Sequence, residues 1–80
     1  MYYVYILKSI KYPGKMYVGF TVDVSQRLVV HNEGKSKYTA KYMPWVLHGY
    51  VAFQDEEKAI LFEKYLKSGA GKSFAKNHFL

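Results

Sequence analysis

Two runs of strand-forming residues around a Pro-Gly pair constrain the fold of this chain most strongly. Tyr2–Lys8 is rich in aromatic and β-branched residues, and Lys15–Phe20 has a similar composition. The stretch between them, Lys11-Tyr12-Pro13-Gly14, is typical of a tight turn. The chain is therefore expected to begin with an antiparallel β-hairpin.

A helix is expected directly after the hairpin, over residues Asp23–Glu33. Thr21 and Asp23 are both candidates for its N-cap, because either side chain can bring an oxygen close to the free N–H groups of a helix start. Apolar residues recur within the segment at helical spacing. Gly34 is a natural stop, since glycine readily adopts the left-handed conformation that ends many helices.

The second half of the chain predicts one more strand and two more helices. Lys35–Pro44 is expected to be a polar, basic loop, and Trp45–Phe53 a third strand with a bulge at Gly49. Asp55 is expected to cap a helix that runs to about Ser68, with acidic residues in its first turn, where the helix dipole favours them.

The glycine-rich stretch Gly69-Ala70-Gly71-Lys72-Ser73 resembles the end of a phosphate-binding loop. The full motif needs a glycine where this chain has Leu66, and it needs a preceding strand where a helix is expected. No nucleotide cofactor is therefore expected. The stretch is predicted to be a helix C-cap and a basic turn, followed by a short helix over Phe74–Leu80 that is capped by Ser73.

These elements give the order β-β-α-β-α-α, which fits a small α+β domain with a three-stranded antiparallel sheet flanked by helices. Eighty residues allow one domain, and a chain of this length buries only about 60% of its unfolded surface. The hydrophobic content of 50% and the aromatic content of 19% argue against disorder.

The chain carries a net charge of +6, which favours an anionic partner, and nucleic acid is the commonest one. A basic protein without such a partner is the alternative that charge alone leaves open. Ammonium groups contact phosphates and tyrosine rings stack on bases, whereas the alternative for such residues is a solvated surface. The candidates for nucleic-acid contact are Lys35, Lys37, Tyr38, Lys41, Lys72 and Lys76.

Several functional classes are excluded or disfavoured by composition. The chain has no cysteine, which removes disulfides and thiol nucleophiles, and its three histidines lack the close spacing of a zinc site. The apolar start of the chain is short and has no basic region before it, so it does not resemble a signal peptide. Because no apolar run reaches the length of a membrane span, no membrane partner is expected, and the expected location is cytoplasmic.

Arg27 is the single arginine among twelve Lys and Arg residues. Its planar guanidinium matches a phosphate in a way that lysine cannot copy. His31 follows four residues later and therefore lies on the same helix face. This histidine either interacts with the helix C-terminus or forms a hydrogen bond with a tyrosine hydroxyl.

Glu63 and the hairpin tyrosines Tyr5 and Tyr17 each admit a structural and a chemical interpretation. Glu63 lies at the edge of the apolar face of its helix, where it either pairs with Lys67 or serves as a hard oxygen ligand for Mg²⁺ or Mn²⁺. A strand tyrosine is usually a packing residue. It can act as a general base only when neighbours lower its pKa from about 10.

These residues together resemble the GIY-YIG nuclease family, in particular its small stand-alone bacterial members related to the N-terminal domain of the UvrC excision nuclease. The two family tripeptides correspond to Tyr3-Val4-Tyr5 and Tyr17-Val18-Gly19. The helix with Arg27, followed by His31-Asn32-Glu33-Gly34, and the helix with Glu63 complete the set. The resemblance covers nearly the whole chain and implies one domain over residues 1–80.

The resemblance implies an endonuclease that hydrolyses DNA phosphodiester bonds with one divalent ion, Mg²⁺ or Mn²⁺. Glu63 would hold the metal, and Tyr17 would be the general base for the attacking water. Tyr5 would position that water or tune Tyr17. Arg27 would bind the scissile phosphate and stabilise developing charge, and His31 would support a tyrosine hydroxyl or the phosphate. DNA is the expected partner, with structure-selective cleavage in repair, recombination or defence against foreign DNA.

Three positions depart from the family pattern. Tyr3 replaces the first glycine of the family name, and Phe20 stands where some members have a basic residue. The late asparagine of the family has Asn77 as its candidate in this chain. The alternatives are a nucleic-acid-binding module with little or no catalysis and a small interaction protein. Specificity would come from the surface of this domain, from a homodimer or from a protein partner.

Overall fold

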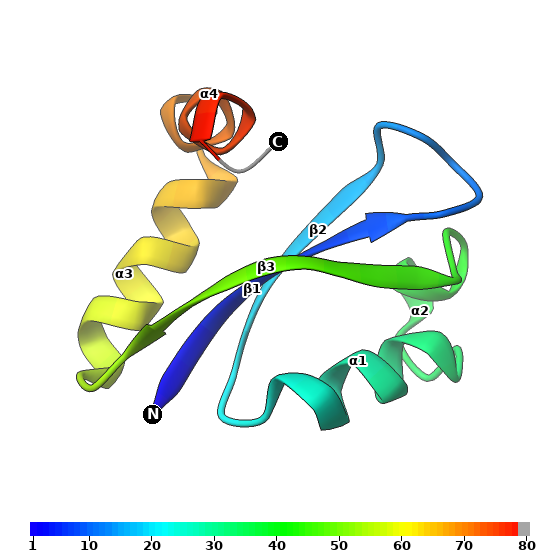
Figure 1. Cartoon of the computed structure of the whole chain (residues 1–80), viewed down its shortest axis with the longest axis horizontal. Coiled ribbons are helices and arrows are strands. Elements are labelled where there is room, and N and C mark those ends of the chain that lie inside the picture. The colour runs from blue at the N-terminus through cyan, green and yellow to red at the C-terminus, as the bar shows by residue number, and fades with distance from the viewer. Residues whose placement is uncertain (79–80) are drawn as a thin grey trace.

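The computed structural model describes residues 1–78 and confirms the α+β fold with a three-stranded antiparallel sheet. The strands are β1 (Tyr2–Ser9), β2 (Met16–Thr21) and β3 (Trp45–Phe53), in the spatial order β2-β1-β3. The helices are α1 (Val24–Asn32), α2 (Lys37–Ala40), α3 (Glu56–Lys67) and α4 (Gly69–His78). The helices lie on both sides of the sheet, α3 and α4 on one side and α1 and α2 on the other (Figure 1).

The predicted hairpin is present, and its turn follows from the Pro-Gly pair. The backbone N–H of Lys15 donates to the carbonyl of Tyr12 at 3.1 Å, and Gly14 has a φ of 91°. A positive φ at this position requires glycine, and proline before it fixes the preceding φ. The two strands that follow pair antiparallel, with Tyr5 directly opposite Gly19.

Helix α1 begins and ends where the sequence predicts. Of the two cap candidates, Asp23 is the N-cap, and its carboxylate accepts the backbone N–H of Gln26 at 3.0 Å. The hydroxyl of Thr21 accepts the N–H of Asp23 at 3.1 Å and so orients the chain that enters the helix. Gly34 has a φ of 75° just after the helix.

Strand β3 contains the irregularity expected near Gly49. The pairing register with β1 shifts between Ile6, which faces Gly49, and Leu7, which faces Leu47. His48 is the extra residue of this bulge, as expected for one residue inserted opposite a regular strand.

The central strand β1 sends alternate side chains into two separate cores. Val4 and Ile6 pack against α3 and α4 in a cluster that also contains Ala59, Leu66 and Ala75. Tyr5 and Leu7 point the other way, toward α1 and α2, and join Trp45. This alternation follows from the two-residue period of a strand, and it decides which residues can reach the functional site.

Three predicted details are wrong. The loop Lys35–Pro44 contains the short helix α2, and the last helix begins at Gly69 rather than at Phe74. Ser68, not Ser73, holds the first turn of α4, because its hydroxyl accepts the N–H of Gly71 at 3.1 Å. Leu80, the predicted end of that helix, lies outside the described residues.

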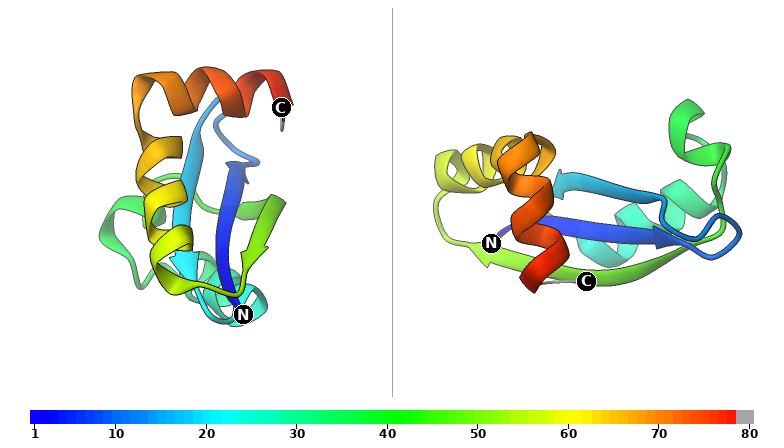
Figure 2. Two further views of the ribbon diagram at one scale, coloured as in Figure 1. Left: turned by 90° about the vertical axis from the view of Figure 1, so that its left-hand side faces the viewer. Right: turned by 90° about the horizontal axis from the view of Figure 1, so that it is seen from above.

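The stretch Gly69–Ser73 was predicted to be a helix C-cap and a basic turn, but it forms the first part of α4. The glycine at position 71 is explained by close packing between α4 and α3. A Cβ at this position would collide with the backbone of Tyr65 and Leu66 in α3. The chain turns sharply at Ser68, between the two helices, and α4 crosses the end of α3 (Figure 2). Glycine at position 71 permits the close approach of the two helices there. Among residues 1–78, the helices are too short or too polar to cross a membrane.

Candidate active site and basic groove

The structure brings the five predicted catalytic residues into one cluster beside the edge strand β2. The Tyr5 hydroxyl lies 2.9 Å from Nε2 of His31, and the rings of Tyr17 and His31 have centroids 4.9 Å apart. Arg27, Tyr17 and Glu63 all lie close enough to Tyr5 to change its ionisation. Residues from β1, β2, α1 and α3 therefore meet in one place, although they are far apart in the sequence.

Gly19 is part of this cluster because it makes room for Tyr5. A Cβ at Gly19 would collide with the ring and hydroxyl of Tyr5, its partner across the two strands. Gly19 itself is buried. Gly19, from the second tripeptide, thus leaves the space in which Tyr5, from the first tripeptide, is buried.

A chain of hydrogen bonds holds the buried His31 ring. Its Nδ1 lies 2.8 Å from the hydroxyl of Thr39, and that hydroxyl donates to the carbonyl of Ser36 at 3.4 Å. The single proton of Thr39 is then used, so Nδ1–H of His31 donates to Thr39. In the neutral ring Nε2 is left as an acceptor, and the hydroxyl of Tyr5 donates to it.

The ionisation of Tyr5 and His31 agrees with this direction of the hydrogen bonds. Burial raises the pKa of Tyr5, and the neighbouring Tyr17 and Glu63 act in the same sense, while hydrogen bonding with Arg27 and its positive charge act against them. Burial, followed by the charge of Arg27, lowers the pKa of His31. Both side chains are therefore neutral at neutral pH, with Tyr5 as a donor and His31 as an acceptor.

Two further residues, Trp45 and Asn32, hold this arrangement, and the sequence predicted no role for either of them in the site. The indole N–H of Trp45 donates to the carbonyl of Thr39 at 2.8 Å, which fixes α2 against β3. The side chain of Asn32 accepts the backbone N–H of Trp45 at 2.6 Å and donates to its carbonyl at 2.9 Å. Asn32 stands next to His31 in the sequence, whereas no local signal marks Thr39.

Glu63 belongs to α3 and is a half-buried residue at one end of the cluster. Its carboxylate forms an ion pair of 3.1 Å with Lys67, and 21% of its side chain is exposed. Among residues 1–78, no group of three or more His, Asp or Glu side chains is placed to hold a metal ion. A single carboxylate nevertheless fits Mg²⁺ or Mn²⁺, since such ions keep several water ligands and take other ligands from the substrate.

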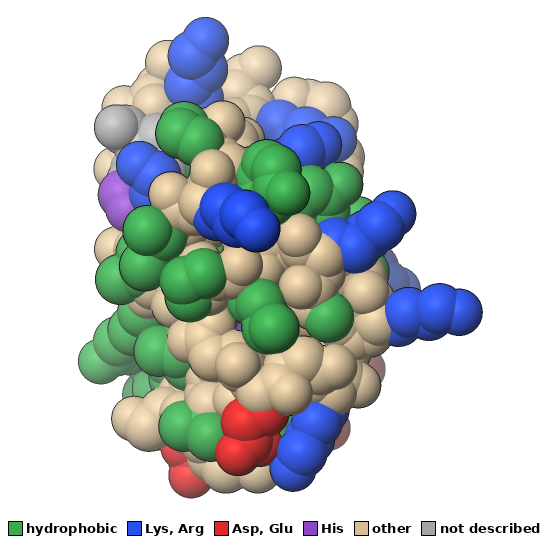
Figure 3. Space-filling view, turned by 90° about the vertical axis from the view of Figure 1, so that its right-hand side faces the viewer, with side chains coloured by type: hydrophobic (Ala, Val, Ile, Leu, Met, Phe, Trp, Pro, Cys, Tyr) green, Lys and Arg blue, Asp and Glu red, His purple; other side chains and the backbone are tan. Residues whose placement is uncertain are grey.

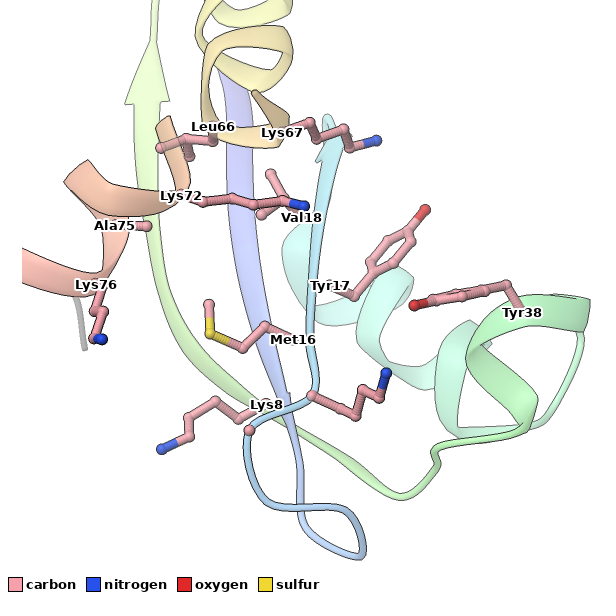
Figure 4. A pocket seen from close by; sticks show the side chains of 12 residues that line it. Lys8, Met16, Tyr17, Val18, Tyr38, Leu66, Lys67, Lys72, Ala75 and Lys76 are labelled. Atoms are coloured by element: carbon pink, nitrogen blue, oxygen red, sulfur yellow. The ribbon is translucent and has the colours of Figure 1, made fainter. Parts of the chain in front are cut away.

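A basic groove of about 900 Å³ opens beside this cluster, between the hairpin and the helices α3 and α4 (Figure 4). None of the described residues that line it is acidic. Tyr17 and Tyr38 stand at one end of it, with ring centroids 6.2 Å apart. The lysines that line the groove are Lys8, Lys15, Lys67, Lys72 and Lys76.

The predicted nucleic-acid contacts divide between two places. Tyr38, Lys72 and Lys76 line the groove. Lys35, Lys37 and Lys41 belong to the segment around α2 and do not line it, and Lys35 forms a 3.1 Å ion pair with Glu33. In the space-filling view, basic side chains are spread over the upper and right-hand parts of the face shown, while acidic ones lie near its lower end (Figure 3).

Three groove lysines were not among the predicted contacts. Lys8 lies near the end of β1, Lys15 directly precedes β2, and Lys67 ends α3. They reach the groove only because the sheet places the hairpin next to α3 and α4.

A family model described as the GIY-YIG catalytic domain matches residues 1–77. The chain belongs to this nuclease family. A UPF0213 protein of Lacticaseibacillus paracasei is 42% identical over 67 residues, which are 82% of this chain and 73% of that protein. A UPF0213 protein of Bacillus licheniformis is 34% identical over 73 residues, covering 90% of this chain and 73% of the relative.

A solved structure is also similar to this chain. A UPF0213 protein from Bacillus halodurans, determined in solution by NMR, is 35% identical to this chain with a TM-score of 0.57. The similarity covers 95% of this chain and 82% of that one. The names of these relatives describe no activity.

The departures from the GIY-YIG pattern lie outside the hydrogen bonds that join Tyr5, His31 and Thr39. Tyr3, in place of the first glycine, packs edge-on against Tyr50 with centroids 5.5 Å apart. Phe20 packs against the apolar core of α3 and α4 and stacks with Tyr2, so it offers no phosphate contact. Asn77 is exposed near the end of α4. Tyr5 and His31 are held by hydrogen bonds in which these three residues take no part.

Proposed function

We propose that this protein is an endonuclease that hydrolyses DNA phosphodiester bonds with the help of one divalent ion. The observation that carries the proposal is the position of the cluster. Tyr17 belongs both to the five-residue cluster and to the wall of the basic groove. A phosphodiester held by the groove lysines would therefore lie next to the groups that the reaction needs.

In this proposal the tyrosines have different tasks. Tyr5 is buried, donates to His31 and has a raised pKa, so it acts as a neutral hydroxyl that positions water and not as a base. Tyr17 is partly exposed beside the groove and takes the proton of the attacking water. His31 and Thr39 are positioning residues, because they act through Tyr5.

Arg27 and Glu63 handle the charge of the phosphate. The guanidinium of Arg27 would bind the non-bridging oxygens and stabilise the charge that develops on them. Mg²⁺ or Mn²⁺, held by Glu63, would supply Lewis-acid stabilisation of the same charge. Removing a preorganised group of this kind typically costs about 10²–10³ in rate.

The groove offers ammonium groups and aromatic faces, and contacts of this type hold nucleic acid without reading its sequence. We therefore propose that the substrate is selected by structure, among branched, nicked or single-stranded DNA, as would suit repair or recombination. A cytoplasmic location, and a homodimer or protein partner as an additional source of specificity, stay predictions.

The test is cleavage of end-labelled branched, nicked and single-stranded DNA with Mg²⁺ or Mn²⁺. The parent protein is compared with Glu63→Gln and Arg27→Ala, and the fold of each variant is checked by its amide NMR spectrum. We expect metal-dependent cutting by the parent and a loss of about 10²–10³ in both variants. DNA binding without cutting by a correctly folded parent would instead make the protein a binding module with a nuclease fold.

A further inference from the structure

Lys67 occupies the junction between the catalytic cluster and the groove. Its ammonium nitrogen lies 3.1 Å from the carboxylate of Glu63 and 5.7 Å from the centre of the Tyr17 ring. The same side chain lines the groove, where it extends from the end of α3 toward Tyr17 (Figure 4). One ammonium group therefore contacts the candidate metal ligand, the candidate base and the path of the substrate.

The simplest explanation of this contact is an ordinary helix ion pair, four residues apart. Such pairs stabilise a helix by only a few tenths of a kcal/mol, and half of the Lys67 side chain is exposed. The weakness of the pair is important, because it lets the ammonium leave at little cost. Lysine also has a long flexible stem, so its charge can move several ångströms without disturbing the helix.

We infer that Lys67 is a counterion that exchanges between Glu63 and a substrate phosphate in the groove. Without nucleic acid, the ammonium neutralises Glu63 and lies over Tyr17. A phosphate in the groove attracts the ammonium and frees the carboxylate for a divalent ion. The inference rests on the proposed function, since it assigns regulation to the same site.

A coupling between metal and DNA binding follows from this exchange. The divalent ion has to displace Lys67 from Glu63, whereas bound DNA has already drawn the ammonium away. By linkage, DNA should raise the affinity for the ion, and the ion should raise the affinity for DNA by the same factor. The negative charge of DNA attracts cations in any case, so the part due to Lys67 has to be isolated by substitution.

Lys67→Met keeps the length of the side chain and removes its charge, and Lys64→Met is the matched control. Lys64 is an exposed lysine of the same helix that is not among the described residues lining the groove. Both variants lose one positive charge from α3. Only the first one removes the competitor of the metal at Glu63.

The measurement is the Mn²⁺ affinity of the three proteins, from the electron paramagnetic resonance of the free ion, at fixed low ionic strength. It is made without DNA and with a short phosphorothioate oligonucleotide that is checked to remain intact. Without DNA, we expect Lys67→Met to bind Mn²⁺ about two- to fivefold more tightly than the parent, as corresponds to loss of a weak ion pair. Lys64→Met should stay close to the parent. The oligonucleotide should raise the Mn²⁺ affinity of the parent by a larger factor than that of Lys67→Met.

The outcomes separate this inference from the proposed function. Equal Mn²⁺ affinities of the three proteins would overturn the role of Lys67, even if the parent cuts DNA. A higher Mn²⁺ affinity in Lys67→Met alone would support the role of Lys67, even if no DNA is cut. Absence of both Mn²⁺ binding and cutting would overturn both. A purely structural role of Lys67 would change the thermal unfolding of Lys67→Met and leave its Mn²⁺ affinity unchanged.

Discussion

The two faces of the sheet differ in how their buried side chains are held. The face under α3 and α4 is an apolar cluster that includes Val4 and Ile6. The face under α1 and α2 buries Tyr5 together with the polar side chains of His31 and Thr39, all three almost fully inaccessible. Adjacent residues of one strand, β1, supply both environments.

The difference shows a division of labour between stability and chemistry. Apolar packing tolerates small shifts, because its attraction has no direction. A buried polar side chain is costly unless each of its hydrogen bonds is formed, so the network around His31 admits few arrangements. Every buried side-chain nitrogen and oxygen in residues 1–78 has a partner. The polar face therefore fixes the positions of Tyr5 and His31, whereas Glu63 is supplied by α3. The apolar face supplies much of the stability.

The largest expected effect tests the apolar face. Ile6 is 2% exposed, and Ile6→Ala should lower the free energy of unfolding by about 2–5 kcal/mol, because it removes buried methyl groups and leaves a cavity. Urea denaturation measures this change. The milder Ile6→Val, expected to cost about 0.5–1.5 kcal/mol, keeps the test usable if the alanine variant does not fold. The cleavage rate of the folded fraction of Ile6→Val should equal that of the parent. A large fall in this rate would contradict the division of labour between the two faces.

Thr39→Val is the corresponding substitution in the polar face. Valine has nearly the shape of threonine but leaves the Nδ1–H of the buried His31 without an acceptor. We expect a loss of about 1–3 kcal/mol in unfolding free energy, together with slower cleavage. Thr39→Ser keeps the hydroxyl and should retain most of the activity.

The tautomer of His31 gives a second measurement on these variants. Nitrogen-15 NMR of the ring distinguishes a protonated Nδ1 from a protonated Nε2. The parent and Thr39→Ser should show the proton on Nδ1. A parent with the proton on Nε2 would reverse the direction of the hydrogen-bond chain, and valine at position 39 would then leave no histidine N–H without an acceptor.

The amount of this architecture that the sequence predicts depends on the range of the interactions involved. The hairpin turn at Gly14 and the cap at Asp23 are local, and both were predicted. The start of α4 was not, because Gly71 serves a contact with α3 that is absent from the local sequence. Thr39 carries no local mark either, since it becomes important only when α2 lies against His31 and Trp45.

For the site residues, too, what the sequence predicts depends on the range of the interactions. The types and order of Tyr17, Arg27 and Glu63 in the sequence indicate a nuclease family without reference to any contact. The groove did not follow from charge patterning along the chain, because Lys8 and Lys67 lie at opposite ends of the sequence and meet only in the folded protein. Charge patterning indicates the segment around α2 instead, because Lys35, Lys37 and Lys41 are close together in the sequence.

A smaller effect concerns the pH dependence of stability, which the polar face should control. The pKa of His31 is lowered from its usual value near 6.5, so below that pH the unfolded chain binds a proton that the folded one does not. The unfolding free energy should therefore be insensitive to this group above pH 6.5. It should fall below that pH, by at most about 1.4 kcal/mol per unit, until the folded histidine also titrates.

Urea titrations between about pH 6.5 and pH 5.5 isolate this contribution from the carboxylates, which titrate mostly at lower pH. His31→Gln serves as the control, because it has no titrating ring at this position. If the unfolding free energy of His31→Gln falls with pH as steeply as that of the parent, the pH dependence arises from other groups.

The smallest expected effect compares the lysines of the groove with those around α2. The double variant Lys72→Met/Lys76→Met removes two charges from the groove, and Lys37→Met/Lys41→Met removes two from outside it. All four were predicted nucleic-acid contacts, and the net charge changes equally. Each phosphate contact that is lost lowers the slope of log affinity against log salt by about 0.7–0.9.

Fluorescence anisotropy with a labelled oligonucleotide, at several salt concentrations, therefore distinguishes the two surfaces. We expect the groove variant to lose about 1.5 from the slope and severalfold in affinity, while the other variant stays close to the parent. The opposite result would mean that the DNA backbone runs along α2. Tyr38 would then be the link between that path and Tyr17, since its ring lies within 6.2 Å of it.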